Sequence, residues 1–258
     1  MQWDPSLENS DRRHLDGFDA VVHLAGESIA AGRWTKKKKQ RIRDSRVTGT
    51  RLLAKALANV EQRPQVLVCA SAIGYYGDRG DEVLDEQSAA GDSFLADVCQ
   101  EWEAAADPAR DNGIRVVHLR FGIILSRKGG ALQKMLLPFW LGAGGVVGSG
   151  KQYWSWVSLD DVVGSIEYAM SDETLSGPVN CVAPDPPTNR EFTKTLGEVL
   201  HRPTVLPVPA LGAKLLLGQM AKELLLASTR VVPKKLQAAG YQFKFADLDA
   251  ALRHALGK

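Results

Sequence analysis

Hydrophobic and polar positions follow two patterns along this chain. Short, nearly continuous apolar runs rich in β-branched side chains indicate buried strands, and segments whose apolar residues recur every three or four positions indicate helices. Strands are predicted at residues 19–25, 65–71, 114–122 and 177–183, and helices at about residues 34–60, 92–106 and 158–170. Because strands and helices alternate, the pattern predicts an α/β fold with a parallel sheet covered by helices on both faces.

The pattern changes after Gly122. A helical stretch, a glycine-rich loop and an aromatic segment follow between residues 127 and 157. From Pro184 onward the chain is mostly helical and punctuated by prolines. We therefore expect a sheet domain over residues 1–183 and a smaller, mostly helical C-terminal region over residues 184–258.

Composition narrows the class of protein. The chain has 258 residues, 45% of them hydrophobic, and its 32 basic and 30 acidic residues give a net charge of +2, which calls for no polyanionic partner. No apolar run reaches the roughly 18 residues of a membrane span, and the charged N-terminus is not a signal peptide. Three cysteines, Cys69, Cys99 and Cys181, lie far apart in apolar surroundings. We expect a cytoplasmic protein with reduced cysteines, no metal site and no membrane partner.

The loop Ser71–Gly77, "SAIGYYG", directly follows an apolar run and carries a serine and two tyrosines. If that run is a central strand, the loop lies at its carboxyl end, where open parallel sheets bind ligands. We therefore interpret Ser71, Tyr75 and Tyr76 as candidate catalytic residues. In the alternative interpretation the loop is a plain turn in which the tyrosine rings pack.

A second predicted strand ends in small residues at His23–Glu27, "HLAGE". There Ala25 and Gly26 would let a flat ligand lie against the backbone, although a tight turn would need the same residues. Further along, Arg46 lies beside small side chains on the following predicted helix. Its guanidinium could reach a phosphate or a backbone carbonyl.

Two other stretches suggest ligands that we do not expect. Lys36–Lys39 resembles a nucleic-acid patch, but the lysines open an amphipathic helix, where we expect them to face solvent, and only Trp34 is near for base stacking. The glycine-rich stretch 142–150 departs from the dinucleotide fingerprint, since Val147 occupies a glycine position and the flanking strand and helix are missing. We interpret that stretch as a flexible loop beside a cleft, and we expect no nucleic-acid partner.

Together these stretches resemble the extended short-chain dehydrogenase/reductase superfamily, and more narrowly its atypical, epimerase-like branch among the NAD-dependent epimerase/dehydratase proteins. The resemblance covers essentially the whole chain and rests on the order of the motifs. They read "VVHLAGESI", "DSRVTGTRLL", "SAIGYYG", "FLADVCQEWEAAA", "LRFGIILSRKGGAL", "LPFWLGAGGVVGSGKQYWSWVSLDDV", "GPVNCVAP" and "VVPKKLQAAGYQF". The last segment is similar to a short C-terminal domain of unknown function, DUF1731.

The resemblance implies a Rossmann-type, doubly wound sheet that binds NADP(H), with NAD as the alternative, and a small-molecule substrate. The residues that it places at the cofactor are Leu24, Ala25, Gly26, Arg46, Ser71, Arg120 and Ile124. Of these, Leu24 to Gly26 would lie under the adenine–ribose part, and Ser71 or Tyr75 would face the nicotinamide. The residues that it places on the substrate side are Gly144, Gly145, Gly148 and Trp156. No feature of the sequence specifies an oligomeric state.

The chain departs from the superfamily at the catalytic pair. The superfamily uses a tyrosine followed four residues later by a lysine, whose charge lowers the pKa of the tyrosine. None of the five tyrosines here has a lysine at that spacing. The corresponding helix has Phe94 or Leu95 near the tyrosine position and Val98 or Cys99 near the lysine position. The position of the usual catalytic serine falls on Ala72. Without the pair and the serine, the motifs do not predict ordinary dehydrogenase chemistry.

The second departure is the glycine-rich first βα turn of the superfamily, which is absent from this chain. The helix after that turn normally holds the cofactor pyrophosphate, and its strand normally lies in the centre of the sheet. We interpret the chain as N-terminally incomplete, either through a truncated gene record or as a shortened form. A shortened form is expected to have low stability or to depend on a partner.

These observations leave several functions open. The leading hypothesis is an NADP(H)-dependent oxidoreductase or sugar-epimerase-like enzyme, with proton transfer by Tyr75, Tyr76 or water. The first alternative is an NADP(H)-binding sensor or scaffold without turnover, which the missing tyrosine–lysine pair favours. The second alternative is an inactive, truncated homologue.

Overall fold

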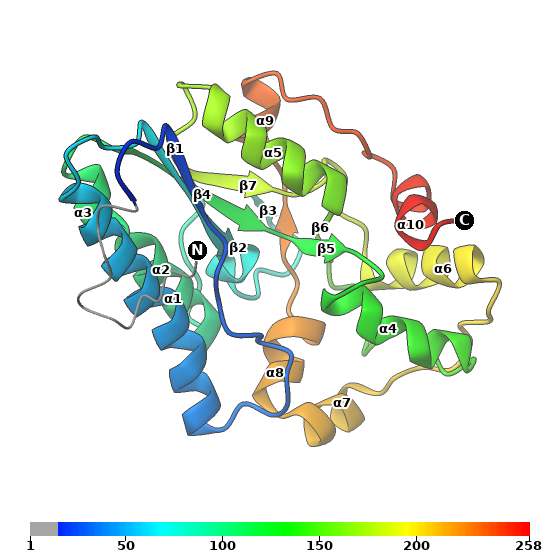
Figure 1. Ribbon diagram of the computed structural model, residues 1–258. Coiled ribbons are helices and arrows are strands. Elements are labelled where there is room, and N and C mark those ends of the chain that lie inside the picture. Colours follow the sequence, from blue (N-terminus) through cyan, green and yellow to red (C-terminus); the bar gives the residue numbers. More distant parts are fainter. Residues whose placement is uncertain (1–14) are drawn as a thin grey trace.

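In the computed structural model, which describes residues 15–258, a four-stranded parallel sheet forms the centre of the fold (Figure 1). Its strands are β1 (Ala20–His23), β2 (Val66–Ala72), β4 (Arg115–Phe121) and β7 (Gly177–Cys181). They lie in the order β1–β2–β4–β7, and every neighbouring pair is parallel. The predicted α/β, Rossmann-type fold is therefore confirmed, and each of the four predicted strands is present.

Helices cover both faces of this sheet (Figure 1). Side chains of β2 alternate between two cores, so that Val68 packs with one cluster and Leu67 with the other. One face is covered by α1 (Lys36–Ala58) and α3 (Asp107–Arg110), with α2 (Phe94–Ala104) beside α1, and the other by α5 (Leu159–Ser171) and α9 (Lys234–Ala238). Burial on both faces explains why the strands are apolar nearly throughout.

The helices begin at side-chain caps that the sequence carries. Thr35 accepts a hydrogen bond from the backbone of α1, and Ser93 does the same for α2. Ser158, the predicted cap, accepts one from the backbone N–H of Asp161 in α5. Such caps satisfy backbone donors that the first turn of a helix leaves without partners.

A separate core, which we call the second core, lies beyond the carboxyl end of the sheet. Its elements are β5 (Ile123–Leu125), α4 (Gly130–Trp140), β6 (Trp156–Ser158), α6 (Asn189–Leu200) and α10 (Leu248–Leu256). Strands β5 and β6 pair in parallel, which brings the segment after β4 next to the aromatic segment before α5. This second core and the sheet core that contains Val68 therefore both draw on residues from either side of position 184.

The C-terminal part of the chain crosses back to the sheet. It contains α7 (Ala210–Leu217), α8 (Gln219–Ala221), a π-helix η3 (Lys222–Leu226) and β8 (Arg230–Val231). Strand β8 pairs with β3 (Val83–Leu84), which follows the 3-10 helix η2 (Ile73–Tyr76). The region is mostly helical, as predicted, but β8 and α9 pack on the sheet domain. Within residues 15–258, no helix combines the length and apolar character that crossing a bilayer requires.

Candidate functional site

The carboxyl end of β1 presents a small, open surface. Leu24, Ala25 and Gly26 are all exposed, and the side chain of Leu24 retains 53% of its accessible area. Strand ends of open parallel sheets are the usual place for ligands, and small residues let a flat ligand approach the backbone. These residues fit the adenine–ribose role that the resemblance gives them, and that role stays a prediction.

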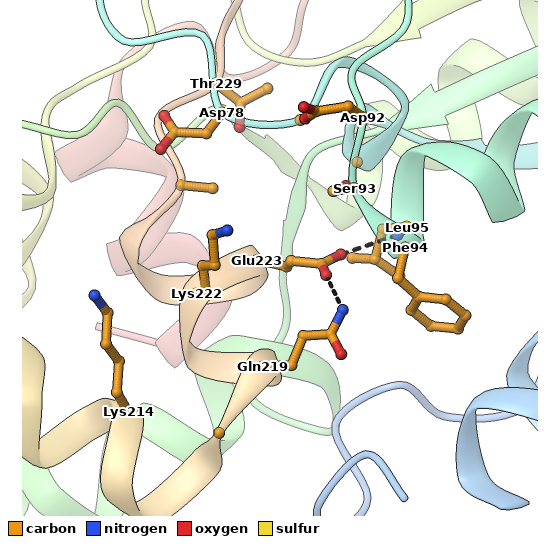
Figure 2. A pocket seen from close by; sticks show the side chains of 14 residues that line it. Asp78, Asp92, Ser93, Phe94, Leu95, Lys214, Gln219, Lys222, Glu223 and Thr229 are labelled. Carbon is orange, nitrogen blue, oxygen red and sulfur yellow. Dashed lines mark hydrogen bonds between the residues drawn. The ribbon is translucent and has the colours of Figure 1, made fainter. Parts of the chain in front are cut away.

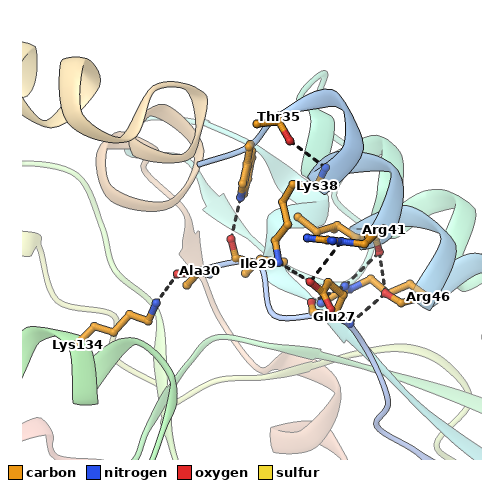
Figure 3. Close-up of polar contacts among 11 residues, drawn as sticks. Glu27, Ile29, Ala30, Thr35, Lys38, Arg41, Arg46 and Lys134 are labelled. Atoms are coloured by element: carbon orange, nitrogen blue, oxygen red, sulfur yellow. Dashed lines mark hydrogen bonds and ion pairs between the residues drawn. The ribbon is translucent and has the colours of Figure 1, made fainter. Parts of the chain in front are cut away.

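Arg46 of α1 lies directly beneath this strand end. Its Nη1 donates to the carbonyl oxygen of Glu27 at 3.0 Å and to that of Ile42 at 3.1 Å (Figure 3). Its guanidinium also lies 5.0 Å from the ring centre of Trp102. A methyl group at Gly26 would come within 3.2 Å of the guanidinium carbon, so glycine keeps the two groups close. Burial lowers the pKa of Arg46, but a guanidinium still stays charged at neutral pH. The structure shows the backbone-carbonyl contact, and the phosphate contact stays a prediction.

The loop between β1 and α1 is fixed by ionic and polar contacts (Figure 3). Lys38, only 4% exposed, places its Nζ 2.5 Å from a carboxylate oxygen of Glu27. That hydrogen bond and charge lower the pKa of Glu27. The expectation that all four lysines of this run face solvent is therefore wrong for Lys38, because the loop supplies a carboxylate above the helix. Lys134 of α4 donates to the carbonyl of Ala30 and ties the same loop to the second core.

Ser71 and Arg120 meet in the interior, below the strand ends. Nε and Nη2 of Arg120 each donate to a carboxylate oxygen of Glu103 at 2.8 Å, and the Ser71 hydroxyl donates to the same carboxylate at 2.7 Å. Arg120 is only 2% exposed. Burial alone would lower the pKa of Arg120, but its bonds to Glu103 outweigh burial and raise it. Both predicted cofactor residues thus belong to one buried ion-pair network, and contact with a ligand stays a prediction for each.

The two tyrosines of η2 have different surroundings. Tyr76 is fully buried, donates to the side-chain oxygen of Asn180 at 2.7 Å and accepts from Arg120 at 2.9 Å. Burial raises the pKa of Tyr76 to about 12. Tyr75 is partly exposed, and the guanidinium carbon of Arg120 lies 3.5 Å from its ring centre. Tyr75 is therefore the more accessible of the two catalytic candidates.

A cavity of about 760 Å³ opens between η2, the amino end of α2 and the segment α7–η3 (Figure 2). Gly74 and Gly77, on either side of the tyrosines, line it, whereas Tyr75 and Tyr76 do not. The polar side chains around it are Asp78, Asp92, Ser93, Lys214, Gln219, Lys222, Glu223 and Thr229. This size is typical of small-molecule sites.

Glu223 joins the two sides of this cavity. Its Oε2 accepts a hydrogen bond from the backbone N–H of Leu95 at 2.9 Å, and its Oε1 accepts one from Gln219 at 2.6 Å (Figure 2). The carboxylate therefore satisfies a backbone donor in the first turn of α2. Lys214, Lys222 and Glu223 were not predicted as site residues. The available signal was the set of polar residues that interrupts the leucine-rich segment 210–226.

Helix α2 has apolar groups at the positions where the resemblance would place an acid–base pair. Phe94 lines the cavity, and Val98 and Cys99 are buried. Burial raises the pKa of the Cys99 thiol to about 12, so this group stays protonated at neutral pH. The helix therefore supplies no group at these positions that exchanges a proton readily at neutral pH.

The predicted substrate-side residues lie in the second core, outside the cavity lining. Trp156 is fully buried, and a methyl group at Gly145 would overlap the carbonyl oxygen of Leu206. Gly144 packs against the ring of Phe139. Gly148, which has φ +60°, and Ile124 of β5 are partly buried. The assignment of Trp156 and the three glycines to the substrate side stays a prediction, and so does the cofactor role of Ile124.

Comparison with known proteins gives two family matches. The NAD dependent epimerase/dehydratase family matches residues 7–181, more than half of the chain, and the domain of unknown function DUF1731 matches residues 208–255. Epimerase family protein Mb2239 of Mycobacterium bovis is 43% identical over 255 residues, which cover 99% of this chain and 84% of that protein. Human epimerase family protein SDR39U1 is 38% identical over 242 residues, which cover 93% of this chain and 82% of that protein.

Two solved structures resemble the fold closely. The crystal structure of human SDR39U1 (isoform 2) with NADPH has a TM-score of 0.88 at 37% identity, and the match covers 93% of this chain and 82% of the human one. The nucleoside-diphosphate sugar epimerase from Corynebacterium glutamicum has a TM-score of 0.79 at 39% identity, with 99% of this chain and 49% of that chain covered.

Proposed function

The chain belongs to the NAD dependent epimerase/dehydratase family, and on this premise we propose that it binds NADP(H) at the carboxyl ends of β1 and β2 and acts on a small molecule in the adjoining cavity. One observation carries the cofactor part: Gly26 lies open above the guanidinium of Arg46. A cation beneath an open strand end suits a phosphorylated dinucleotide. The NADPH in the related human structure supports the same assignment.

Isothermal titration calorimetry with NADPH and NADH tests the cofactor. We expect heat of binding with both and a lower Kd for NADPH. Arg46→Met should raise the Kd for NADPH about tenfold, which corresponds to about 1.4 kcal/mol. The matched control is Arg51→Met, an exposed arginine further along α1. Absence of binding by the folded wild-type chain would overturn the proposal.

For the chemistry, a bound nicotinamide supplies or accepts a hydride. We assign proton transfer to the hydroxyl of Tyr75, the accessible tyrosine of η2. Arg120 holds the ring from one face, and its own position is held by Glu103. The cavity begins at Gly74, next to Tyr75, so a substrate there would lie beside the strand ends.

The Tyr75→Phe variant tests this role. Loss of the hydroxyl should lower turnover by roughly 10² to 10⁴, the usual contribution of general acid–base catalysis, and leave the Kd for NADPH unchanged. Tyr153→Phe is the control, since Arg230 stacks on that ring at 4.7 Å and the residue lies outside the cavity lining. Unchanged turnover in Tyr75→Phe would remove this residue from the mechanism.

A second candidate function is an NADP(H)-binding sensor or scaffold without turnover. Phe94 and Val98, at positions where the superfamily has its acid–base pair, favour it because neither side chain can exchange a proton. The discriminating assay follows NADPH absorbance with a broad panel of carbonyl compounds. Tight NADPH binding with no oxidation across the panel would support the sensor and contradict the enzyme.

The proposal also includes a division of the chain near residue 184 and a cytoplasmic location. Free, buried cysteines at Cys69, Cys99 and Cys181 support a reducing compartment. Limited proteolysis would test the division, since cleavage between residues 181 and 208 is expected if the two matched family segments unfold separately. Fractionation of cells would test the location.

A further inference from the structure

Large apolar side chains are exposed at the end of α4, on the segment after α6 and on α7, three segments that lie along one edge of the fold (Figure 1). We call this surface the apolar edge and define it by Trp140, Leu141, Val205, Leu211, Leu215 and Leu216. Their exposed fractions run from 51% to 80%, so most of each side chain is in contact with water. Large exposed apolar surfaces usually mark an interaction site.

The three pieces of the apolar edge adjoin one another. Nε of Arg202 donates to the carbonyl oxygen of Trp140 at 3.1 Å, which joins the segment after α6 to the end of α4. A bridge between Gly145 and Val205 extends this contact. Helix α7 begins a few residues later, at Ala210. The six exposed side chains therefore come from segments that adjoin one another in space or in sequence.

The segments that form the apolar edge carry basic but no acidic side chains. Residues 112–159 and 199–222, which contribute all six side chains, contain no aspartate or glutamate. Basic groups lie at both ends: Arg202 at Trp140, and Arg33, whose Nη2 donates to the carbonyl oxygen of Leu215 at 3.3 Å. Both arginines are exposed. The surface thus combines apolar side chains with positive charge.

We propose that the apolar edge docks this protein on the surface of an anionic lipid bilayer. Leucine and tryptophan side chains flanked by arginine suit the boundary between headgroups and acyl chains, where apolar burial and attraction to anionic lipid add together. Contact with a second copy is disfavoured, because a twofold contact would bring arginines of like charge together. The protein lies on the bilayer without crossing it, and this departs from the expectation of no membrane partner.

Vesicle co-sedimentation tests this inference independently of NADP(H) binding. The probes are vesicles of phosphatidylcholine alone and of phosphatidylcholine with phosphatidylglycerol in a three-to-one mixture. We expect the protein to sediment with the anionic vesicles. Raising the salt concentration shortens the screening length and should release the protein from them. The double variant Leu215→Gln/Leu216→Gln should lower the partition coefficient at least tenfold, and Arg202→Gln should lower it less.

The matched control is Leu159→Gln/Val163→Gln, which removes two exposed apolar side chains from α5, away from the apolar edge. This control should bind the vesicles as the wild type does. Because the substituted side chains are exposed, both double variants should fold, and circular dichroism checks this. Leu211→Gln provides a second variant on α7.

Three results would overturn the inference. One is no sedimentation with anionic vesicles. Another is binding that the leucine variant leaves unchanged, which would assign it to charge elsewhere on the molecule. The third is a dimer in sedimentation velocity that Leu215→Gln/Leu216→Gln dissociates, which would make the apolar edge a contact between copies of the chain.

Discussion

The two sides of the cavity differ in how their charges are held. On the sheet side, Arg120 and Glu103 lie behind η2 and outside the cavity lining, buried and bound to each other at 2.8 Å. On the side of α7–η3, Lys214 and Lys222 are exposed and pair with no residue in the part of the chain that the structure describes (Figure 2). Buried, bonded groups hold one geometry, whereas exposed lysines keep their rotamer freedom. The contrast fits the proposed function, with a rigid base for the cofactor and an adaptable side for a substrate.

Breaking the buried pair of Arg120 and Glu103 should cause the largest loss of unfolding free energy. Glu103→Ala leaves the charge of Arg120 buried without its partner, which costs roughly 3–5 kcal/mol of unfolding free energy. Urea denaturation measures the change. Glu101→Ala is the control on the same helix, since its partner Arg43 is 3.4 Å away and both side chains are partly exposed. That control should cost less than about 1 kcal/mol. Equal losses in the two variants would contradict the contrast.

Low pH should cause the next largest loss of unfolding free energy, on the sheet side. Burial in β4 lowers the pKa of His118 from 6.5 to about 4, so the unfolded chain binds a proton between these values that the folded chain does not. The resulting stability is complete above pH 6.5 and is lost as the pH falls toward 4, by roughly 3 kcal/mol. His118→Leu should flatten this part of the stability–pH curve, measured by urea denaturation at several pH values. His201→Asn, at an exposed histidine, should leave the slope unchanged.

A smaller effect, on the Kd for NADPH, is expected at the carboxyl end of β1. Gly26→Ala brings a methyl group to 3.2 Å from the guanidinium carbon of Arg46 and must displace that side chain. We expect the Kd for NADPH to rise about tenfold, or about 1.4 kcal/mol, with little change in stability. Gly49→Ala is the control, because no atom lies within 4 Å of a methyl group there. An unchanged Kd in Gly26→Ala would separate Arg46 from the cofactor.

The smallest effect is predicted on the adaptable side. Glu223→Ala removes the acceptor of the Leu95 N–H and should lower the unfolding free energy by about 1 kcal/mol, as loss of a helix cap does. Ser93→Ala removes the local cap of the same helix and provides the comparison. A loss in Glu223→Ala as large as that in Glu103→Ala would show that this side is as rigid as the sheet side.

The sheet could be predicted from the sequence because its signals are local. Apolar runs marked β2 and β4, and Ser158 marked the start of α5 through its own spacing to Asp161. Partners that lie far apart in the chain left no such signal. No residue near Glu103 in the sequence indicates its partner Arg120, because the two come together only when the chain folds. In the same way Glu223 caps a helix that begins 129 residues earlier at Phe94.

The direct test of the central claim is hydrogen–deuterium exchange with and without NADPH. The account predicts slower exchange with the cofactor in residues 24–27 and 71–77, at the ends of β1 and β2. It predicts unchanged exchange in the glycine-rich residues 142–150, which pack in the second core. Protection of 142–150 with no change at the two strand ends would contradict the proposed cofactor site.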